Sequence, residues 1–217
     1  MSEIINTFID PVYHRLVKSG DENQNEIYIL LHGWLGNEKS MSIFSSVIPH
    51  SSTIVYPRGT TKLGNDQYGW VDINNSSSNF YDYAKSSKFL FKSIIELLKS
   101  FDLDDPKKKF NLIGFSQGAA MCAVLSLLYP DSFNKIAILA GFLPKNHPEE
   151  LIENLEPIHY YIAHGKDDQL VSFDKSIELR DFLLMRNANV QFCEEDIGHK
   201  VGKNCLKNLK NFFLPYS

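Results

Sequence analysis

The chain has 217 residues and a formal net charge of −4, with 43% hydrophobic and 22% charged residues. These values are ordinary for one globular α/β domain and give no reason to expect nucleic acid or an anionic membrane surface as a partner. No apolar run approaches the ~20 residues that span a bilayer, and the first residues lack the pattern of a signal peptide. We therefore expect a single cytoplasmic domain over residues 1–217, without a transmembrane segment.

Apolar runs that predict strands alternate with segments of helical periodicity. Strands are predicted at residues 13–17, 26–31, 53–56, 110–113, 136–139, 158–163 and 190–194. Helices are predicted at residues 39–48, 80–101, 117–129, 173–187 and 200–213. The polar stretch at residues 74–79 is too short to divide the chain into two domains. The alternation predicts an α/β fold with a mostly parallel central sheet and helices on both faces, whose sites form at the carboxyl ends of strands.

The three cysteines are predicted to be reduced. An odd number argues against a disulfide framework, and none of the three has metal-ligand spacing. Cys122 falls in the apolar helix 117–129, Cys193 in the strand 190–194 and Cys205 in the last helix. Structural thiols are the default in a cytoplasmic protein, so we expect all three to be free.

The most informative motif is Gly114-Phe115-Ser116-Gln117-Gly118, between a predicted strand and a predicted apolar helix. A G-x-S-x-G sequence in this position is typical of a nucleophile elbow, a tight turn that pushes the serine hydroxyl out above the sheet. Glycines flank it because a side chain there would collide with the neighbouring strand or helix. The three fixed positions alone would arise by chance in roughly 7% of chains this long, and a phosphate-binding turn can look similar. The other strand-end loops must therefore decide whether this turn is a nucleophile elbow or a phosphate-binding turn.

A second loop supplies a candidate oxyanion site. Gly33 and Gly36 follow the strand 26–31 and allow the backbone to turn sharply, although a plain glycine turn would look the same. A backbone amide of this loop and the N–H of Gln117 would face one point above Ser116. Two fixed N–H donors are what a tetrahedral oxyanion needs.

Two later loops supply a candidate acid and base. Asp168 follows the strand 158–163 and is our choice for the carboxylate, with Asp167 as the fallback. His199 follows the strand 190–194 and lies downstream of both Ser116 and the aspartates, which gives the chain order expected for this kind of hydrolase. Such a histidine takes the proton of the serine and returns it to the leaving group, while the carboxylate holds the imidazole tautomer.

The other six histidines are not assigned to the chemistry. His32 and His164 also follow strands, and we expect them to hydrogen-bond loop backbone. The remaining four are treated as incidental: His14, His50, His147 and His159.

These motifs together resemble those of the phospholipase/carboxylesterase group of small α/β-hydrolases, which also holds the acyl-protein thioesterases. The matching segments are Leu31-His32-Gly33, Gly36-Asn37-Glu38, Pro57-Arg58-Gly59, Gly69-Trp70-Val71-Asp72, the run from Gly114 to Ala119, His164-Gly165-x-x-Asp168-x-x-Val171 and Gly198-His199. They occur in the order of the family and span residues 26–200.

The resemblance implies cofactor-free and metal-free hydrolysis of carboxylic esters or thioesters, of small-molecule or lipid-like substrates, through an acyl-enzyme. It implies Ser116, Asp168 and His199 as the catalytic triad. The oxyanion donors would be the backbone N–H groups of Trp34 and Gln117. By the same resemblance, the substrate pocket is expected near Tyr68, Trp70, Phe142, Leu143 and Leu170.

Two residues depart from the family pattern, and two other functions stay open. Ser172 stands where proline is common, and Trp34 stands where a small or aliphatic residue is common, so Trp34 could narrow the acyl pocket. The same site would also serve an acyltransferase with a non-water acceptor. A ligand-binding protein on a hydrolase fold is the rival from another class, but a degraded triad would be expected of it.

Overall fold

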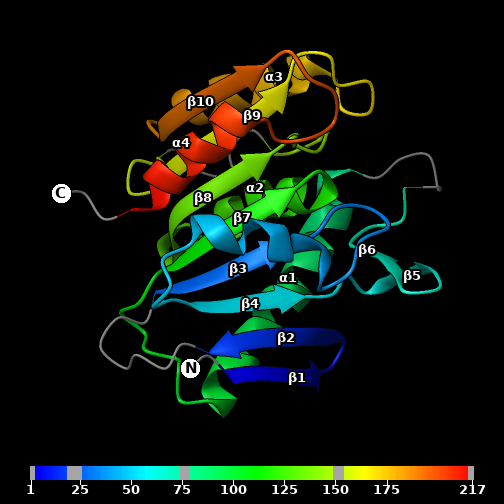
Figure 1. The fold of residues 1–217 in the computed structure, drawn as a ribbon, viewed down its shortest axis with the longest axis vertical. Coiled ribbons are helices and arrows are strands. Elements are labelled where there is room, and N and C mark those ends of the chain that lie inside the picture. The colour runs from blue at the N-terminus through cyan, green and yellow to red at the C-terminus, as the bar shows by residue number, and fades with distance from the viewer. Residues whose placement is uncertain (1–2, 19–25, 74–78, 149–153, 215–217) are drawn as a thin grey trace.

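Eight strands form one sheet, in the order β1-β2-β4-β3-β7-β8-β9-β10 (Figure 1). The computed structural model describes residues 3–18, 26–73, 79–148 and 154–214. The strands are β1 (Glu3–Ile9), β2 (Val12–Lys18), β3 (Ile27–Leu31), β4 (Thr53–Pro57), β7 (Phe110–Phe115), β8 (Phe133–Leu139), β9 (His159–Gly165) and β10 (Asn189–Glu195). The six strands β4, β3, β7, β8, β9 and β10 pair in parallel with their neighbours in this order, whereas β2 pairs antiparallel with both β1 and β4. The carboxyl ends of the parallel strands therefore meet along one edge.

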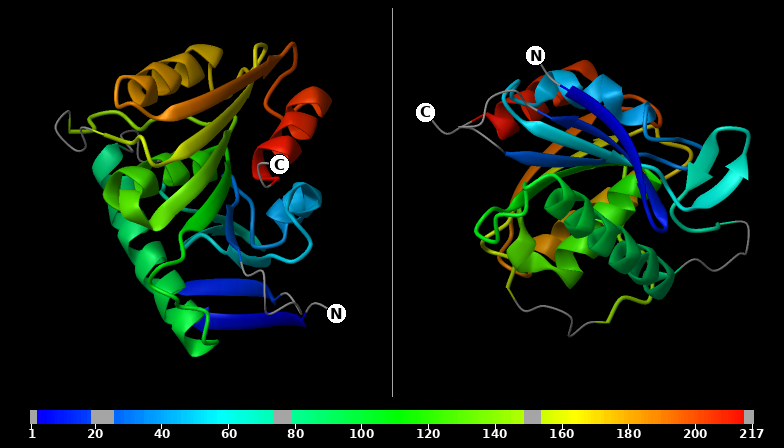
Figure 2. Two further views of the ribbon diagram at one scale, coloured as in Figure 1. Left: turned by 90° about the vertical axis from the view of Figure 1, so that its left-hand side faces the viewer. Right: turned by 90° about the horizontal axis from the view of Figure 1, so that it is seen from below.

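Helices cover both faces of this sheet (Figure 2). One face carries α1 (Phe80–Ser100), α2 (Gln117–Leu128) and α3 (Phe173–Leu184), and the other carries the 3₁₀ helix η1 (Ser40–Val47) and α4 (Lys203–Phe213). A one-turn 3₁₀ helix, η2 (Pro130–Ser132), follows α2. Eleven of the twelve residues of α2, all but Leu128, are buried, as its apolar sequence predicted. Among the described residues, no helix is both long and apolar enough to cross a bilayer.

The predicted alternation is confirmed, and three strands were missed. Each predicted strand and helix is present with slightly different bounds, but β1 and the small hairpin of β5 (Thr61–Gly64) and β6 (Gln67–Gly69) had not been expected. The edge strand β1 has no buried residue, so its sequence carries no clear pattern of a buried face. Apart from Asn79, the polar loop expected at residues 74–79 lies outside the described residues.

The predicted helix at 39–48 is present as a 3₁₀ helix. Its serines account for part of this difference, because the hydroxyls of Ser42, Ser45 and Ser46 each bond to the carbonyl three residues earlier. Such local side-chain bonds compete with α-helical backbone pairing.

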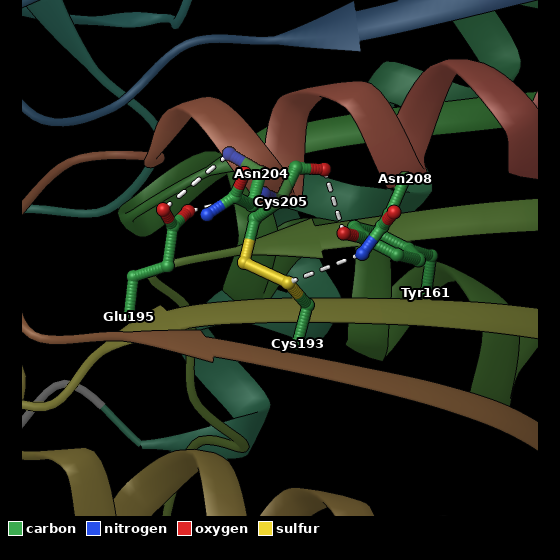
Figure 3. Close-up of a disulfide and its surroundings, with 6 residues drawn as sticks. All are labelled: Tyr161, Cys193, Glu195, Asn204, Cys205 and Asn208. Atoms are coloured by element: carbon green, nitrogen blue, oxygen red, sulfur yellow. Dashed lines mark hydrogen bonds between the residues drawn. A yellow bond between two sulfur atoms is a disulfide. The ribbon is translucent and has the colours of Figure 1, made fainter.

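The expectation of three free thiols is wrong for two of them. Cys193 on β10 and Cys205 on α4 form a disulfide, while Cys122 is free and buried (Figure 3). The pairing depends on α4 folding back over β10, which the spacing of the two cysteines in the sequence does not reveal. The disulfide joins the two ends of the segment from Cys193 to Cys205, which contains His199.

Candidate active site

Ser116 lies in a strained turn between β7 and α2. Its φ of 54° and ψ of −117° fall in a region that side-chain-bearing residues rarely adopt. The turn is held by the Ser116 N–H, which donates to the Leu139 carbonyl at 2.9 Å, and by the Ser116 carbonyl, which accepts from Ala119 and Ala120 at the start of α2. Strain of this kind clusters at functional sites because the surrounding structure must maintain it.

The glycines on either side of the serine allow close packing of backbone on backbone. A Cβ on Gly118 would collide with the carbonyl of Leu31 at the end of β3, and a Cβ on Gly114 would collide with the carbonyl of Gly118. Any side chain would therefore push α2 away from the sheet. Close backbone packing therefore requires both glycines, as the sequence suggested.

His199 and Asp168 are joined by a hydrogen bond of 2.6 Å from the imidazole Nδ1 to the carboxylate Oδ2. Asp168 is buried, with 5% of its surface exposed, and its other oxygen accepts from the N–H groups of Leu170 and Val171. Asp167, the fallback choice, is exposed. The geometry therefore brings His199 together with Asp168.

The carboxylate of Asp168 is kept ionised by its hydrogen bonds. Burial alone would raise its pKa, but the N–H of Val171, the ring of His199 and the N–H of Leu170 outweigh burial and hold the pKa below its usual value. A second imidazole, that of His164, approaches the same oxygen with Nε2 at 3.2 Å and also contacts the Val171 carbonyl. His164 thus supports the loop of the acid, in line with the structural role expected for it.

The loops that carry Asp168 and His199 are bonded to each other. The Lys166 N–H donates to the Glu195 carbonyl at 2.9 Å, and the Asp167 N–H donates to the Ile197 carbonyl at 3.0 Å. A Cβ on Gly165 would collide with the carbonyl of Ile197, so this contact also requires glycine. The two loops form one backbone unit that fixes the distance between acid and imidazole.

The end of the His199 loop is anchored to α4. The Glu195 carboxylate accepts from the backbone N–H groups of Asn204 and Cys205 in the first turn of this helix, and the Tyr161 hydroxyl donates to the Cys205 carbonyl at 2.7 Å (Figure 3). A carboxylate is favourable at this helix end because the first N–H groups have no partner within the helix. Together with the disulfide, these bonds tie the loop to the sheet on both sides.

The loop after β3 lies directly against Ser116. A Cβ on Gly33 would stand 3.2 Å from the Cβ of Ser116. The Gly33 carbonyl accepts from the His32 Nδ1–H at 2.7 Å and from the Gly36 N–H at 3.1 Å. Because the C=O and N–H of a trans peptide point in opposite directions, these bonds aim the Trp34 N–H away from their donors.

The two amides expected to bind the oxyanion have no acceptor among the described residues. Neither the N–H of Trp34 nor that of Gln117 donates a hydrogen bond within this part of the chain. Gln117 is the first residue of α2, where helical N–H groups lack a partner and the helix dipole favours negative charge. Both donors are therefore available to a ligand.

His32 is the anchor of this loop. Its Nε2 accepts from the Gly59 N–H at 2.9 Å, its backbone carbonyl accepts from the Trp70 indole N–H at 2.7 Å, and its Nδ1 binds Gly33 as described. Burial lowers the pKa of His32 to about 4, so the ring is neutral and can keep accepting at Nε2. The prediction that His32 bonds loop backbone is confirmed.

Gln117 has a second role that the sequence did not reveal. Its side-chain oxygen accepts from the Trp70 N–H and its side-chain nitrogen donates to the Val71 carbonyl, both at 2.7 Å. The Gly69-Trp70-Val71-Asp72 segment is thereby bonded to the start of α2. The Trp34 indole packs on Gly69, where a Cβ would collide with it.

An ion pair between the half-buried Arg58 and the buried Glu38 supports the same region. Arg58 binds both carboxylate oxygens of Glu38, at 2.6 and 2.8 Å, and its guanidinium lies over the rings of Tyr13 and Tyr68. The motifs Gly36-Asn37-Glu38 and Pro57-Arg58-Gly59 thus meet in space. Their contacts hold the loops that carry Glu38 and Arg58 in position. The sequence alone does not reveal this contact, because the two motifs are about 20 residues apart.

Two pockets flank the site. One, of about 840 Å³, is lined by Asp168 together with three of the expected pocket residues, Phe142, Leu143 and Leu170; it reaches Lys175 of α3 and is called the α3-side pocket. The other, of about 440 Å³, lies between η1 and α4 and is called the α4-side pocket.

The other two expected pocket residues lie outside both linings. Tyr68 packs against Arg58, and Trp70 is buried beside His32 with 2% of its surface exposed. No group of three His, Cys, Asp or Glu side chains within the described ranges is arranged to hold a metal ion.

Acid should destabilise the fold through two buried histidines. His14 donates from Nε2 to Ser93, and its buried Nδ1 has no partner within the described part of the chain; burial lowers its pKa to about 4, as for His32. A folded pKa below the unfolded value of about 6.5 stabilises the fold above pH 6.5, and this contribution is lost as the pH falls toward 4.

We expect His14→Gln to remove part of this acid sensitivity. Between pH 7 and 4.5 one such histidine costs about 2.5 kcal/mol of unfolding free energy. Urea unfolding at the two pH values should therefore show a loss smaller by about that amount in the variant than in the wild type. An equal loss in both proteins would contradict a neutral, buried His14.

The fold and the arrangement of the strand-end loops are those of an α/β-hydrolase. The chain belongs to the phospholipase/carboxylesterase family, whose model matches residues 13–215. This family holds ester and thioester hydrolases, in agreement with the resemblance seen in the sequence.

Relatives and solved structures agree with this assignment. Acyl-protein thioesterase 1 of Cryptococcus neoformans is 28% identical over 167 residues, which cover 71% of this chain and 68% of the relative. A probable carboxylesterase SOBER1-like protein of Arabidopsis thaliana is 27% identical over 214 residues, which cover 90% and 80%. The crystal structure of the Bacillus cereus carboxylesterase matches with a TM-score of 0.83 at 23% identity, covering 94% of both chains, and supports the fold.

Proposed function

We propose that this protein hydrolyses carboxylic esters or thioesters through an acyl-enzyme on Ser116. The observation that carries the proposal is the Asp168–His199 hydrogen bond of 2.6 Å, at the same sheet edge as the strained Ser116. The amides of Trp34 and Gln117, which bond to no other described residue, would add the electrostatic part of such a site beside Ser116. Family membership and the names of the relatives point to the same chemistry.

In this mechanism the Ser116 hydroxyl oxygen attacks the carbonyl carbon while His199 Nε2 takes the hydroxyl proton. The carbonyl oxygen becomes an oxyanion held by the N–H groups of Trp34 and Gln117. The tetrahedral intermediate collapses, the bond to the leaving oxygen or sulfur breaks, and the imidazolium gives its proton to that atom. Water then attacks the acyl-enzyme by the same steps and releases the carboxylic acid.

Asp168 has two tasks in this scheme. Its Oδ2 accepts from Nδ1–H of His199, which leaves Nε2 unprotonated and able to act as base. Its negative charge, preserved by the N–H groups of Leu170 and Val171, then stabilises the imidazolium that forms.

A fluorophosphonate probe tests the proposal directly. We expect one equivalent of probe to phosphonylate Ser116 alone, identified by mass spectrometry of the peptide that contains it. Turnover of p-nitrophenyl butanoate should fall in proportion to the fraction labelled, because the modified hydroxyl can no longer attack. Full turnover after complete labelling, or labelling of another serine in its place, would refute the role of Ser116.

A further inference from the structure

The α4-side pocket is an apolar cavity that opens between η1 and α4, on the face of the sheet opposite α2. It encloses about 440 Å³. Its apolar lining consists mainly of Leu35, Met41, Ile43, Phe44, Val201 and Leu206. Ile43 and Leu35, which both line the pocket, keep 71% and 49% of their surface exposed, so apolar surface extends from the pocket to solvent, as at many ligand-binding sites.

The pocket reaches the oxyanion loop and the chain neighbours of Ser116 and His199. Gly33 and Trp34 of the oxyanion loop line it, as do Phe115, which precedes Ser116, and Lys200, which follows His199. The Phe115 ring packs against the His199 imidazole with centroids 5.1 Å apart. A substrate with its carbonyl over Ser116 can therefore place one substituent in this pocket.

The orientation of His199 decides which substituent that is. Asp168 holds Nδ1, so Nε2 lies on the opposite edge of the ring and faces away from Asp168. Asp168 lines the α3-side pocket, while the residues after His199 line the α4-side pocket. Since Nε2 must give its proton to the leaving atom, this arrangement favours a leaving group on the α4 side and an acyl group on the α3 side.

We propose that the α4-side pocket binds the leaving group of the substrate, an apolar alcohol or thiol without a positive charge. This inference rests on the proposed function, because a leaving group exists only if Ser116 accepts an acyl group. Among the described residues, the lining contains one charged side chain, the cation Lys200, and no carboxylate, so these residues offer a quaternary ammonium alcohol no counter-ion. An aliphatic or aromatic alcohol or thiol matches the lining in shape and polarity.

Two ester series separate the pockets. In the first, the acyl group is fixed as butanoyl and the alcohol grows from ethanol to octanol; in the second, the leaving group is fixed as p-nitrophenol and the acyl chain grows from acetyl to octanoyl. We expect kcat/KM in the alcohol series to rise by up to about fourfold per methylene until the pocket is full, the factor that corresponds to about 0.8 kcal/mol per buried methylene.

Ile43→Asp tests the pocket itself, with Ser46→Asp as the matched control. Both positions are exposed on η1, and both changes add one negative charge, but only Ile43 lines the pocket. We expect Ile43→Asp to reduce the octyl-to-ethyl ratio of kcat/KM by tenfold or more and to leave the octanoyl-to-acetyl ratio unchanged. Ser46→Asp should change neither ratio.

The outcomes distinguish this inference from the proposed function. If fluorophosphonate does not label Ser116 and no ester is turned over, the proposed function fails and the leaving-group assignment falls with it. If Ser116 is labelled but kcat/KM is independent of alcohol length, the pocket assignment alone is overturned. It is also overturned if Ile43→Asp reduces the chain-length ratio in the acyl series, because the pocket would then hold the acyl chain.

Discussion

Ser116→Ala is expected to reduce kcat for p-nitrophenyl butanoate by about 10⁶-fold, the loss typical when the nucleophile of a triad is removed. The reason is that neither the imidazole nor a bound water can replace a hydroxyl fixed in this turn. Stability should change little, because alanine has the same Cβ as serine and meets the same backbone strain at φ 54°. Initial rates over a wide range of enzyme concentration, together with urea unfolding, measure both quantities.

Ser126→Ala provides the control for this substitution. Ser126 is a buried serine of the same helix α2, whose hydroxyl donates to the Ala123 carbonyl at 2.8 Å. This variant should keep turnover close to that of the wild type and should not lose labelling by fluorophosphonate. Turnover near the wild-type kcat in Ser116→Ala would remove Ser116 from the mechanism, whatever the control shows.

The sequence predicted the sheet, its helices and the loops that meet at its edge, because these depend on local signals. Continuous apolar runs specify buried parallel strands, and glycines specify the close approaches at Gly33, Gly114 and Gly118. Once the strands are parallel, their carboxyl ends necessarily meet at one edge. Ser116 and His199 therefore had to lie at the same edge, although no local signal gives the distances between side chains.

What the sequence did not predict depends on contacts between distant segments. The disulfide of Cys193 with Cys205 requires α4 to pack over β10, and it removes the free thiols as support for the expected cytoplasmic location, which stays a prediction. The bonds from the Gln117 side chain to residues 70 and 71 join segments 46 and 47 positions apart. Such long-range hydrogen bonds leave no periodic pattern, so a motif marks the residues without revealing what they contact.

Asp168→Asn is expected to reduce kcat by about 10⁴-fold, the loss typical when the acid of a triad becomes an amide. At Asp168, Oδ2 faces the imidazoles of His199 and His164, while Oδ1 faces the N–H groups of Leu170 and Val171. An asparagine amide must place its NH₂ on one of these two sides. If the NH₂ group faces His199, it stabilises the tautomer with the proton on Nε2, and this nitrogen can no longer accept from Ser116. If the NH₂ group faces the backbone, it meets two N–H donors and forms no hydrogen bond with them.

Asp167→Asn is the matched control, because it makes the same chemical change one residue earlier on an exposed side chain. We expect it to lower kcat by less than about threefold, since the Asp167 N–H that bonds to Ile197 is unchanged. The comparison requires both variants to be folded, which urea unfolding at pH 7 measures. A large loss in Asp167→Asn with little loss in Asp168→Asn would make Asp167 the triad acid. It would also mean that the 2.6 Å bond from His199 to Asp168 does not hold the base during turnover.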